Sequence, residues 1–97
     1  MEMNSQDRAF LRGEAQSLSP VVMVGKEGLT GAVTKALDEA LLAHELVKVK
    51  FQHHKDEVKE ISFALSDQTS STLIATTGFT SVFYRRAKKA EDRRYKI

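Results

Sequence analysis

The segment Gly25-Lys26-Glu27-Gly28 has the residue types and spacing that best suit contact with a phosphate group. Two glycines let a backbone turn tightly and leave its N–H groups unobstructed by Cβ atoms. The start of a helix adds unpaired N–H donors and a partial positive charge, which together make a place for an anion. Lys26 supplies the formal charge, whereas Glu27 weakens the attraction.

The same four residues have a simpler interpretation, in which the glycines serve only a tight turn between a strand and a helix. A G-x-x-G loop does clamp nucleic-acid backbone in KH domains, so both interpretations stay open. A nucleotide-hydrolysing P-loop is excluded, because it needs glycine, four residues and then Gly-Lys-Ser/Thr. Here Glu27 follows Lys26.

Further candidates for contact with a polyanion lie in the second half of the chain. Lys48 and Lys50 fall on one face of a predicted strand, where they can follow phosphates or simply form a charged solvent face. Tyr84 can stack on a base, although a single aromatic residue in a final strand is more often part of the core. Arg85 and Arg86 are therefore better candidates than Tyr84.

The charge of the chain is concentrated at its C-terminal end. The net charge is only +2, but residues 85–97 contain seven basic and two acidic side chains. That segment therefore carries +5, and the remaining 84 residues sum to −3. Such an asymmetry suggests a polyanionic partner, although a solvated tail that only aids solubility fits the charge equally well.

Catalytic and metal-binding constellations are not apparent in the sequence. The three histidines, His44, His53 and His54, have no carboxylate at a motif spacing, and there is no cysteine. His44 is expected to stabilise the end of a helix. No serine lies in a Gly-x-Ser-x-Gly elbow. We therefore expect no enzyme activity, no cofactor, no metal and no small-molecule substrate, with a small nuclease as the remaining catalytic alternative.

The first half of the chain predicts a helix, a strand and a second helix. Ser5 can cap a helix over residues 6–17, which Pro20 ends. The apolar run 21–24 is typical of a strand buried on both faces. After the glycine loop, Thr30 can cap a helix that extends to about residue 43, with apolar residues at spacings of three and four.

The second half predicts a strand, a helix and a hairpin. Alternation over residues 45–51 places Val47, Val49 and Phe51 on one face and Leu46, Lys48 and Lys50 on the other. A helix starts near Asp56, and strands at 72–77 and 81–85 are joined by a turn at 78–80. The order αβαβαββ predicts an α/β protein of the two-layer α+β type, with helices packed on a small mixed sheet.

The length of 97 residues allows one compact domain. We expect the folded domain to span residues 1–86 and the basic segment 87–97 to be a loose tail. No apolar run reaches the roughly 18 residues of a membrane helix, and the polar N-terminus does not fit a signal peptide. These features predict a cytoplasmic protein without a membrane partner. No large apolar stripe is left over, which favours a monomer.

Several of these segments, read in order, resemble the bacterial YhbY-like proteins, which are the stand-alone form of the CRM domain. The resemblance rests on residues 20–30, 44–50, Gly78 and 83–85, and it covers roughly residues 5–86. It implies a four-stranded mixed sheet similar to the C-terminal domain of bacterial translation initiation factor three. It also implies RNA binding, with contacts from the loop 25–28, from the strand with Lys48 and Lys50, and from Tyr84 and Arg85.

The sequence departs from the family pattern in the loop and in the first helix. Glu27 places an acid where a small or amide residue is common. The first helix usually carries more basic residues, and here only Arg8 and Arg12 remain among acidic and amide residues. The last strands have Thr77 and Ser81 where bulky aliphatic residues are usual. The first helix, through Arg12, is thus expected to contribute less to RNA binding, and the basic tail more.

The resemblance implies an RNA-binding protein that associates with ribosomal RNA or large-subunit precursor particles during ribosome assembly. The alternative is a protein-binding adaptor whose basic C-terminal tail touches an acidic partner.

Overall fold

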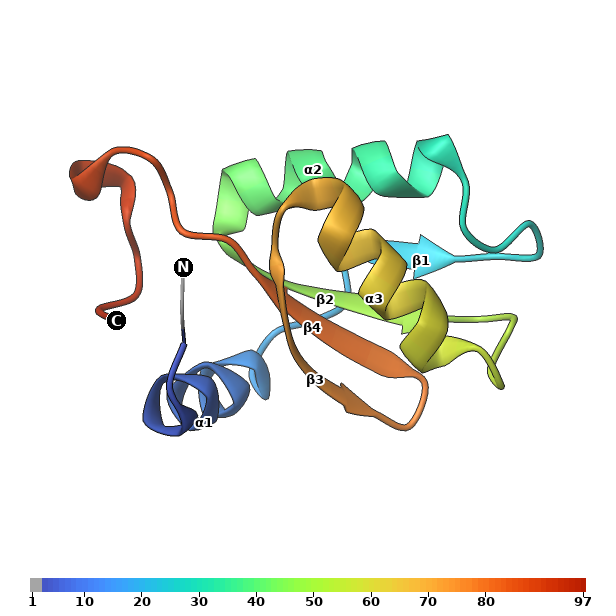
Figure 1. Cartoon of the computed structure of the whole chain (residues 1–97), viewed down its shortest axis with the longest axis horizontal. Coiled ribbons are helices and arrows are strands. Elements are labelled where there is room, and N and C mark those ends of the chain that lie inside the picture. The colour runs from blue at the N-terminus through green and yellow to red at the C-terminus, as the bar shows by residue number, and fades with distance from the viewer. Residues whose placement is uncertain (1–2) are drawn as a thin grey trace.

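The computed structural model describes residues 3–97, which form three α-helices, four β-strands and a turn of 3-10 helix. In chain order the elements are α1 Ser5–Ala15, β1 Val22–Val24, α2 Gly31–His44, β2 Leu46–Phe51, α3 Val58–Thr69, β3 Thr72–Thr77, β4 Thr80–Tyr84 and η1 Ala90–Asp92. The predicted order αβαβαββ is confirmed (Figure 1).

The four strands form one mixed sheet in the order β1-β2-β4-β3. The β1 strand pairs in parallel with β2, with Val22 opposite Val49. The β4 strand is antiparallel to both of its neighbours, β2 and β3. The predicted strand–helix–strand unit and the closing hairpin therefore account for the whole sheet.

The larger core lies between the sheet and the helices α2 and α3. Alternation in β2 buries Val47, Val49 and Phe51 on this face, as predicted. They meet Leu37 of α2 and Leu65 of α3, both of which are fully buried. Each large apolar side chain buried in this way contributes roughly 1.5–3 kcal/mol relative to exposure.

The helix α1 packs on the opposite face of the sheet and forms a smaller core (Figure 1). Leu11 and Ala15 of α1 contact Leu46 and Tyr84 there. The Arg8 guanidinium fixes the helix by donating to the carbonyl oxygens of Leu73 and Ile74, at 2.7 and 3.0 Å. These two carbonyls lie at a bulge in β3, where the register shifts between Leu73 and Ala75.

Three local predictions differ from the structure. The cap of α1 is Asn4 rather than Ser5, because the Asn4 side chain accepts the Asp7 N–H at 2.8 Å. The helix α3 begins at Val58 and not at Asp56. The β1 strand is buried on one face only, since Met23 is 44% exposed at the edge of the sheet. A continuous apolar run does not reveal that a strand lies at an edge.

Candidate nucleic-acid interface

Three loops meet at one end of the sheet (Figure 1). Because β1 and β2 are parallel, the loops that follow them, residues 25–30 and 52–57, leave the sheet on the same side. The β3–β4 turn at residues 78–79 lies there as well, because β4 is antiparallel to β2 and begins opposite its end. We call this region the loop end.

The glycine loop is a tight turn with a steric requirement at its last residue. The Gly28 N–H donates to the Gly25 carbonyl at 3.0 Å. Gly28 has a φ of +67°, and a Cβ atom there would lie 3.3 Å from the His54 ring. Gly25 has no such neighbour. The structure therefore supports a structural need for Gly28, while Lys26 between the glycines is exposed.

His54 connects the glycine loop to the start of α3. Its Nε2 atom lies 2.5 Å from the carbonyl oxygen of Lys26, so that Nε2 must carry the proton of this hydrogen bond. Its Nδ1 atom faces the Glu57 carboxylate at 3.8 Å. The bond to the Lys26 carbonyl raises the pKa of His54, partial burial opposes this rise, and Glu57 and Asp56 add to it. No motif in the sequence pointed to this role of His54.

The side of the loop end that faces α2 and α3 is acidic. A cavity of about 350 Å³ lies between the glycine loop and α3. Three glutamates, Glu27, Glu57 and Glu60, line it beside His54. These carboxylates would repel a phosphate placed near the cavity. An RNA backbone at the loop end is therefore favoured on the other side of the sheet.

The two lysines of β2 have different environments, although both project from the α1 side of the sheet. Lys48 is half-buried, and its Nζ atom donates to the Leu18 carbonyl at 3.0 Å. It thereby ties the chain after α1 to the sheet. Lys50 is exposed, opposite Met23 of β1. Of the pair, Lys50 is the one available to a phosphate.

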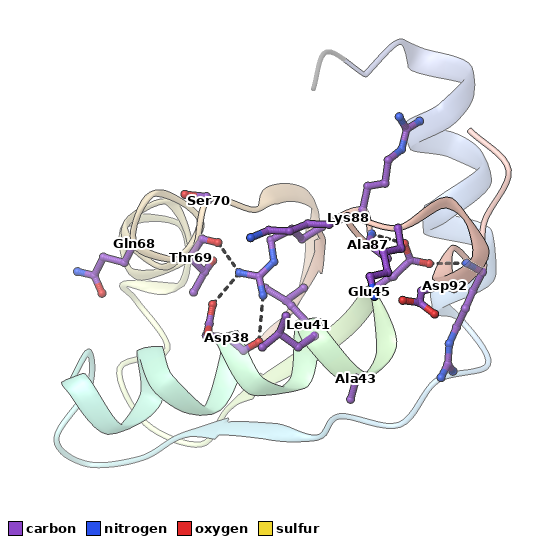
Figure 2. A pocket seen from close by; sticks show the side chains of 15 residues that line it. Asp38, Leu41, Ala43, Glu45, Gln68, Thr69, Ser70, Ala87, Lys88 and Asp92 are labelled. Carbon is purple, nitrogen blue, oxygen red and sulfur yellow. Dashed lines mark hydrogen bonds and ion pairs between the residues drawn. The ribbon is translucent and has the colours of Figure 1, made fainter.

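Tyr84 and Arg85 are engaged within the protein, contrary to a role as open RNA contacts. Tyr84 is 1% exposed and meets Tyr95 edge to face, with ring centroids 6.3 Å apart. A base has no access to its ring in this arrangement. Arg85 donates to Asp38 Oδ1 at 2.7 Å and to the Thr69 carbonyl at 2.6 Å (Figure 2). It fastens the middle of α2 and the end of α3 to the end of β4.

The C-terminal segment is folded onto the domain, so the prediction of a loose tail is wrong. The carboxylate of Glu45 accepts the backbone N–H groups of Ala87 and Arg94, at 2.6 and 2.5 Å (Figure 2). The Arg86 guanidinium donates to the carbonyl oxygen of Ile97. Tyr95 and Ile97 pack against the α1 core. A cavity of about 930 Å³ lies between this segment and the ends of α2 and α3.

Basic side chains surround this folded segment, at the end of the sheet opposite the loop end. We call this region the tail end. Arg12 is exposed on α1, whose buried residues belong to the core against which Tyr95 and Ile97 pack. Exposed basic residues of the segment itself are Lys88, Lys89, Arg93, Arg94 and Lys96. Against these stand the two acids Glu91 and Asp92.

The structure thus divides the predicted site residues between two ends of the molecule. Gly25, Lys26, Glu27 and Gly28 lie at the loop end, with Lys50 nearby. Arg12 and Arg86 lie at the tail end, where Arg86 serves partly as an anchor. The sequence did not single out Phe79, which is exposed in the β3–β4 turn with the Lys55 Nζ atom 4.7 Å from its ring centroid. The feature of the sequence that could have identified Phe79 is an aromatic residue inside a predicted turn.

Within residues 3–97, no group of three or more histidine, aspartate or glutamate side chains is arranged to hold a metal ion. In the same part of the chain, no helix has the length and apolarity needed to cross a membrane.

Comparison with known proteins gives a consistent result. The family model of the CRS1 / YhbY (CRM) domain matches residues 3–85. An "RNA-binding protein" of Haemophilus influenzae is 36% identical over 90 residues, which cover 92% of this chain and 91% of the relative. The Bacillus subtilis "Probable RNA-binding protein YqeI" is 34% identical over 88 residues, 90% of this chain and 92% of the relative.

A solution structure of a Staphylococcus aureus protein superimposes on this fold with a TM-score of 0.81 at 30% sequence identity. The match covers 96% of this chain and 98% of the other.

Proposed function

From the premise that this chain belongs to the CRS1 / YhbY (CRM) domain family, we propose that it is an RNA-binding protein that associates with precursors of the large ribosomal subunit. Both bacterial relatives described above have names that refer to RNA binding. Bacterial members of the family, as the sequence resemblance implies, associate with precursors of the large ribosomal subunit. The protein acts by binding RNA rather than by changing it chemically.

The observation on which this proposal depends is the folded basic segment at the tail end. Five exposed basic side chains follow Ala87, and the Glu45 carboxylate fixes the backbone between them. A charged segment that is already folded loses less conformational entropy on binding than a loose one. Neutralising RNA phosphates with such side chains releases counterions, which provides most of the sequence-independent affinity.

The loop end supplies a second contact in this proposal. Lys26 is exposed between two glycines whose turn is fixed by His54. The protein is 37 Å long along its longest axis, so one RNA molecule can touch both ends. Contacts at two ends of one domain raise the affinity for an RNA that is long enough to reach both of them.

Binding to RNA is tested by fluorescence anisotropy with a labelled fragment of large-subunit RNA at several salt concentrations. With about four to six phosphate contacts, the log–log slope of affinity against salt is near −3 to −5. The Lys26→Glu variant should lower the affinity for all RNAs to a similar degree, since a phosphate contact does not distinguish bases. Lys35→Glu is the matched control, because Lys35 is exposed on α2 and its substitution changes the net charge as much as Lys26→Glu does.

The ribosomal assignment is tested by sucrose-gradient sedimentation of the tagged protein from growing cells. We expect co-migration with large-subunit particles or their precursors at low salt and release as salt rises. If the protein binds RNA in solution but stays at the top of the gradient at low salt, the RNA-binding proposal stands and the ribosomal assignment is contradicted.

A further inference from the structure

We propose that the uncovered part of the sheet at the loop end binds an unpaired RNA nucleotide, with its base on Phe79 and its phosphate on Lys50. This inference rests on the proposed function of RNA binding and deepens it. It names the side of the molecule on which the RNA strand runs and the structural state of the RNA there.

A row of residues crosses all four strands on the side of the sheet that faces α1. The strand register places Met23 opposite Lys50, Lys50 opposite Thr80, and Thr80 opposite Thr77. All four side chains lie on this face, because their neighbours Val22, Val49 and Ser81 point to the α2 and α3 side. We call these four residues the cross-strand row.

The cross-strand row is left open by α1. That helix contacts Leu46 and Tyr84, which lie at the opposite end of β2 and β4. Figure 1 shows α1 near the tail end, with the other end of the sheet extending beyond it. Met23 is accordingly 44% exposed, and Lys50 and Thr77 are exposed as well.

Phe79 borders the row, because the turn that holds it joins Thr77 to Thr80. Phe79 as a residue is 48% exposed. Its backbone is fixed, since the Phe79 carbonyl accepts the Phe51 N–H at 2.7 Å. An exposed ring on a fixed turn is suited to base stacking, which is worth about 1–3 kcal/mol per base and tolerates any base.

The cation beside the ring also fits a nucleotide. The Lys55 Nζ atom lies 4.7 Å from the Phe79 ring centroid, and Lys55 is exposed on a flexible stem. A stacked base can displace this ammonium group from the ring. Its flexible stem lets the displaced group stay near the bound nucleotide, where its positive charge still attracts RNA phosphates.

The distribution of charge favours RNA on the side of the sheet that faces α1 over the side that faces α2 and α3. On the helix side, the cavity at the loop end is lined by Glu27, Glu57 and Glu60. The cross-strand row contains no acidic residue, and within residues 3–97 the Lys50 ammonium group takes part in no ion pair. A phosphate is therefore repelled on one side of the loop end and attracted on the other.

The apolar groups imply an unpaired nucleotide. In an A-form duplex the bases are stacked on one another and only phosphates and minor-groove edges are available. Met23 and Phe79 offer surfaces that only a splayed base can cover. A duplex would use Lys50 and leave both apolar side chains exposed.

The test compares a labelled unstructured RNA of about 12 nucleotides with a blunt RNA duplex of the same strand length. Phe79→Ala should weaken binding of the unstructured RNA about 5- to 150-fold and binding of the duplex less than about 2-fold. Phe79→Trp should restore the affinity. Phe63→Ala is the matched control, because Phe63 is an exposed phenylalanine on α3, on the other side of the sheet.

Lys50→Ala should make the salt slope for the unstructured RNA less steep by about 1, whereas Lys35→Ala should leave it unchanged. Thermal unfolding of each variant verifies that the fold is intact. Equal effects of Phe79→Ala and Phe63→Ala, or equal losses for both RNAs, would overturn the inference while RNA binding stands. Failure of the wild-type protein to bind either RNA would instead overturn the proposed function.

Discussion

The carboxylate of Glu45 accepts the backbone N–H of Arg94, 49 residues further along the chain, at 2.5 Å. The same carboxylate accepts the Ala87 N–H, and Glu45 is 2% exposed. Its φ of +63° turns the chain sharply between α2 and β2 and aims the side chain at the tail end. One buried acid thereby determines the conformation of a segment that is rich in basic residues.

Replacing Glu45 should release the C-terminal segment. Hydrogen bonds to a charged group contribute roughly 1.5–3 kcal/mol, so Glu45→Ala should lower the free energy of unfolding by about 2–4 kcal/mol in urea titrations. Glu45→Gln should have a smaller effect, because one amide oxygen can still accept an N–H. Glu39→Ala, an exposed glutamate of α2, is the control.

The same variant separates the RNA proposal from the adaptor alternative. If the folded basic segment contacts RNA, Glu45→Ala should weaken RNA binding at temperatures where the domain remains folded. An adaptor that used a loose tail would keep its acidic partner in this variant. Unchanged RNA affinity with normal hydrogen–deuterium exchange in residues 87–97 would contradict the anchoring role of Glu45.

Gly28 should tolerate substitution far less well than Gly25. An alanine at a φ of +67° costs about 1–2 kcal/mol, and its Cβ would press on the His54 ring. Gly28→Ala should therefore lower the melting temperature by about 4–8 °C for each kcal/mol lost. Gly25→Ala meets no atom within 4 Å and should change it little. Equal melting temperatures for the two variants would show that the loop conformation is not constrained as described.

Arg85 and Arg12 should show opposite behaviour when replaced by alanine. Arg85 is 21% exposed in its side chain and donates to Asp38 and Thr69, so Arg85→Ala should cost about 2–3 kcal/mol of stability. Arg12 is exposed, and Arg12→Ala should leave stability unchanged while lowering RNA affinity. Urea titration and anisotropy on both variants measure the two quantities. If Arg85→Ala kept its stability and bound RNA weakly, Arg85 would have to be a direct RNA contact and not a structural residue.

The core and the sheet were predictable because each residue's burial follows a local period. Alternation over Val47, Val49 and Phe51 assigned the faces of β2 correctly, and the spacing of Leu37 and Leu41 assigned α2. The edge position of β1 was not predictable, because the four apolar residues of the run 21–24 show no alternation. Edge strands are revealed by pairing, which is a property of the whole sheet.

The structure changes the candidate site at residues whose contacts come from distant parts of the sequence. Tyr84 has a stacking-competent ring, but Tyr95 from the tail covers it. The tail was predicted to be loose because its residues are polar, yet its anchors are backbone N–H groups that meet Glu45. Main-chain donors have no sequence signature, so a contact of this kind is invisible before folding.

The protonation of His54 should link stability to pH through the glycine loop. Its pKa is raised above the ordinary value of 6.5, first by the hydrogen bond to the Lys26 carbonyl and also by Glu57 and Asp56. A group with a raised folded-state pKa stabilises the fold fully below the unfolded value. That contribution is lost as the pH rises through the folded-state pKa.

The difference in unfolding free energy between wild type and His54→Ala should therefore be largest near pH 5 and should shrink toward about pH 8. The titratable groups that both proteins share contribute equally to the two unfolding free energies, so their contribution cancels in the difference. His53→Ala is the control, because His53 is an exposed histidine next to His54 in the chain. NMR titration of the His54 ring gives the pKa directly, and Glu57→Gln should lower it. A pKa at or below 6.5 in the wild type would contradict the preferential stabilisation of the protonated ring by the Lys26 carbonyl and the neighbouring carboxylates.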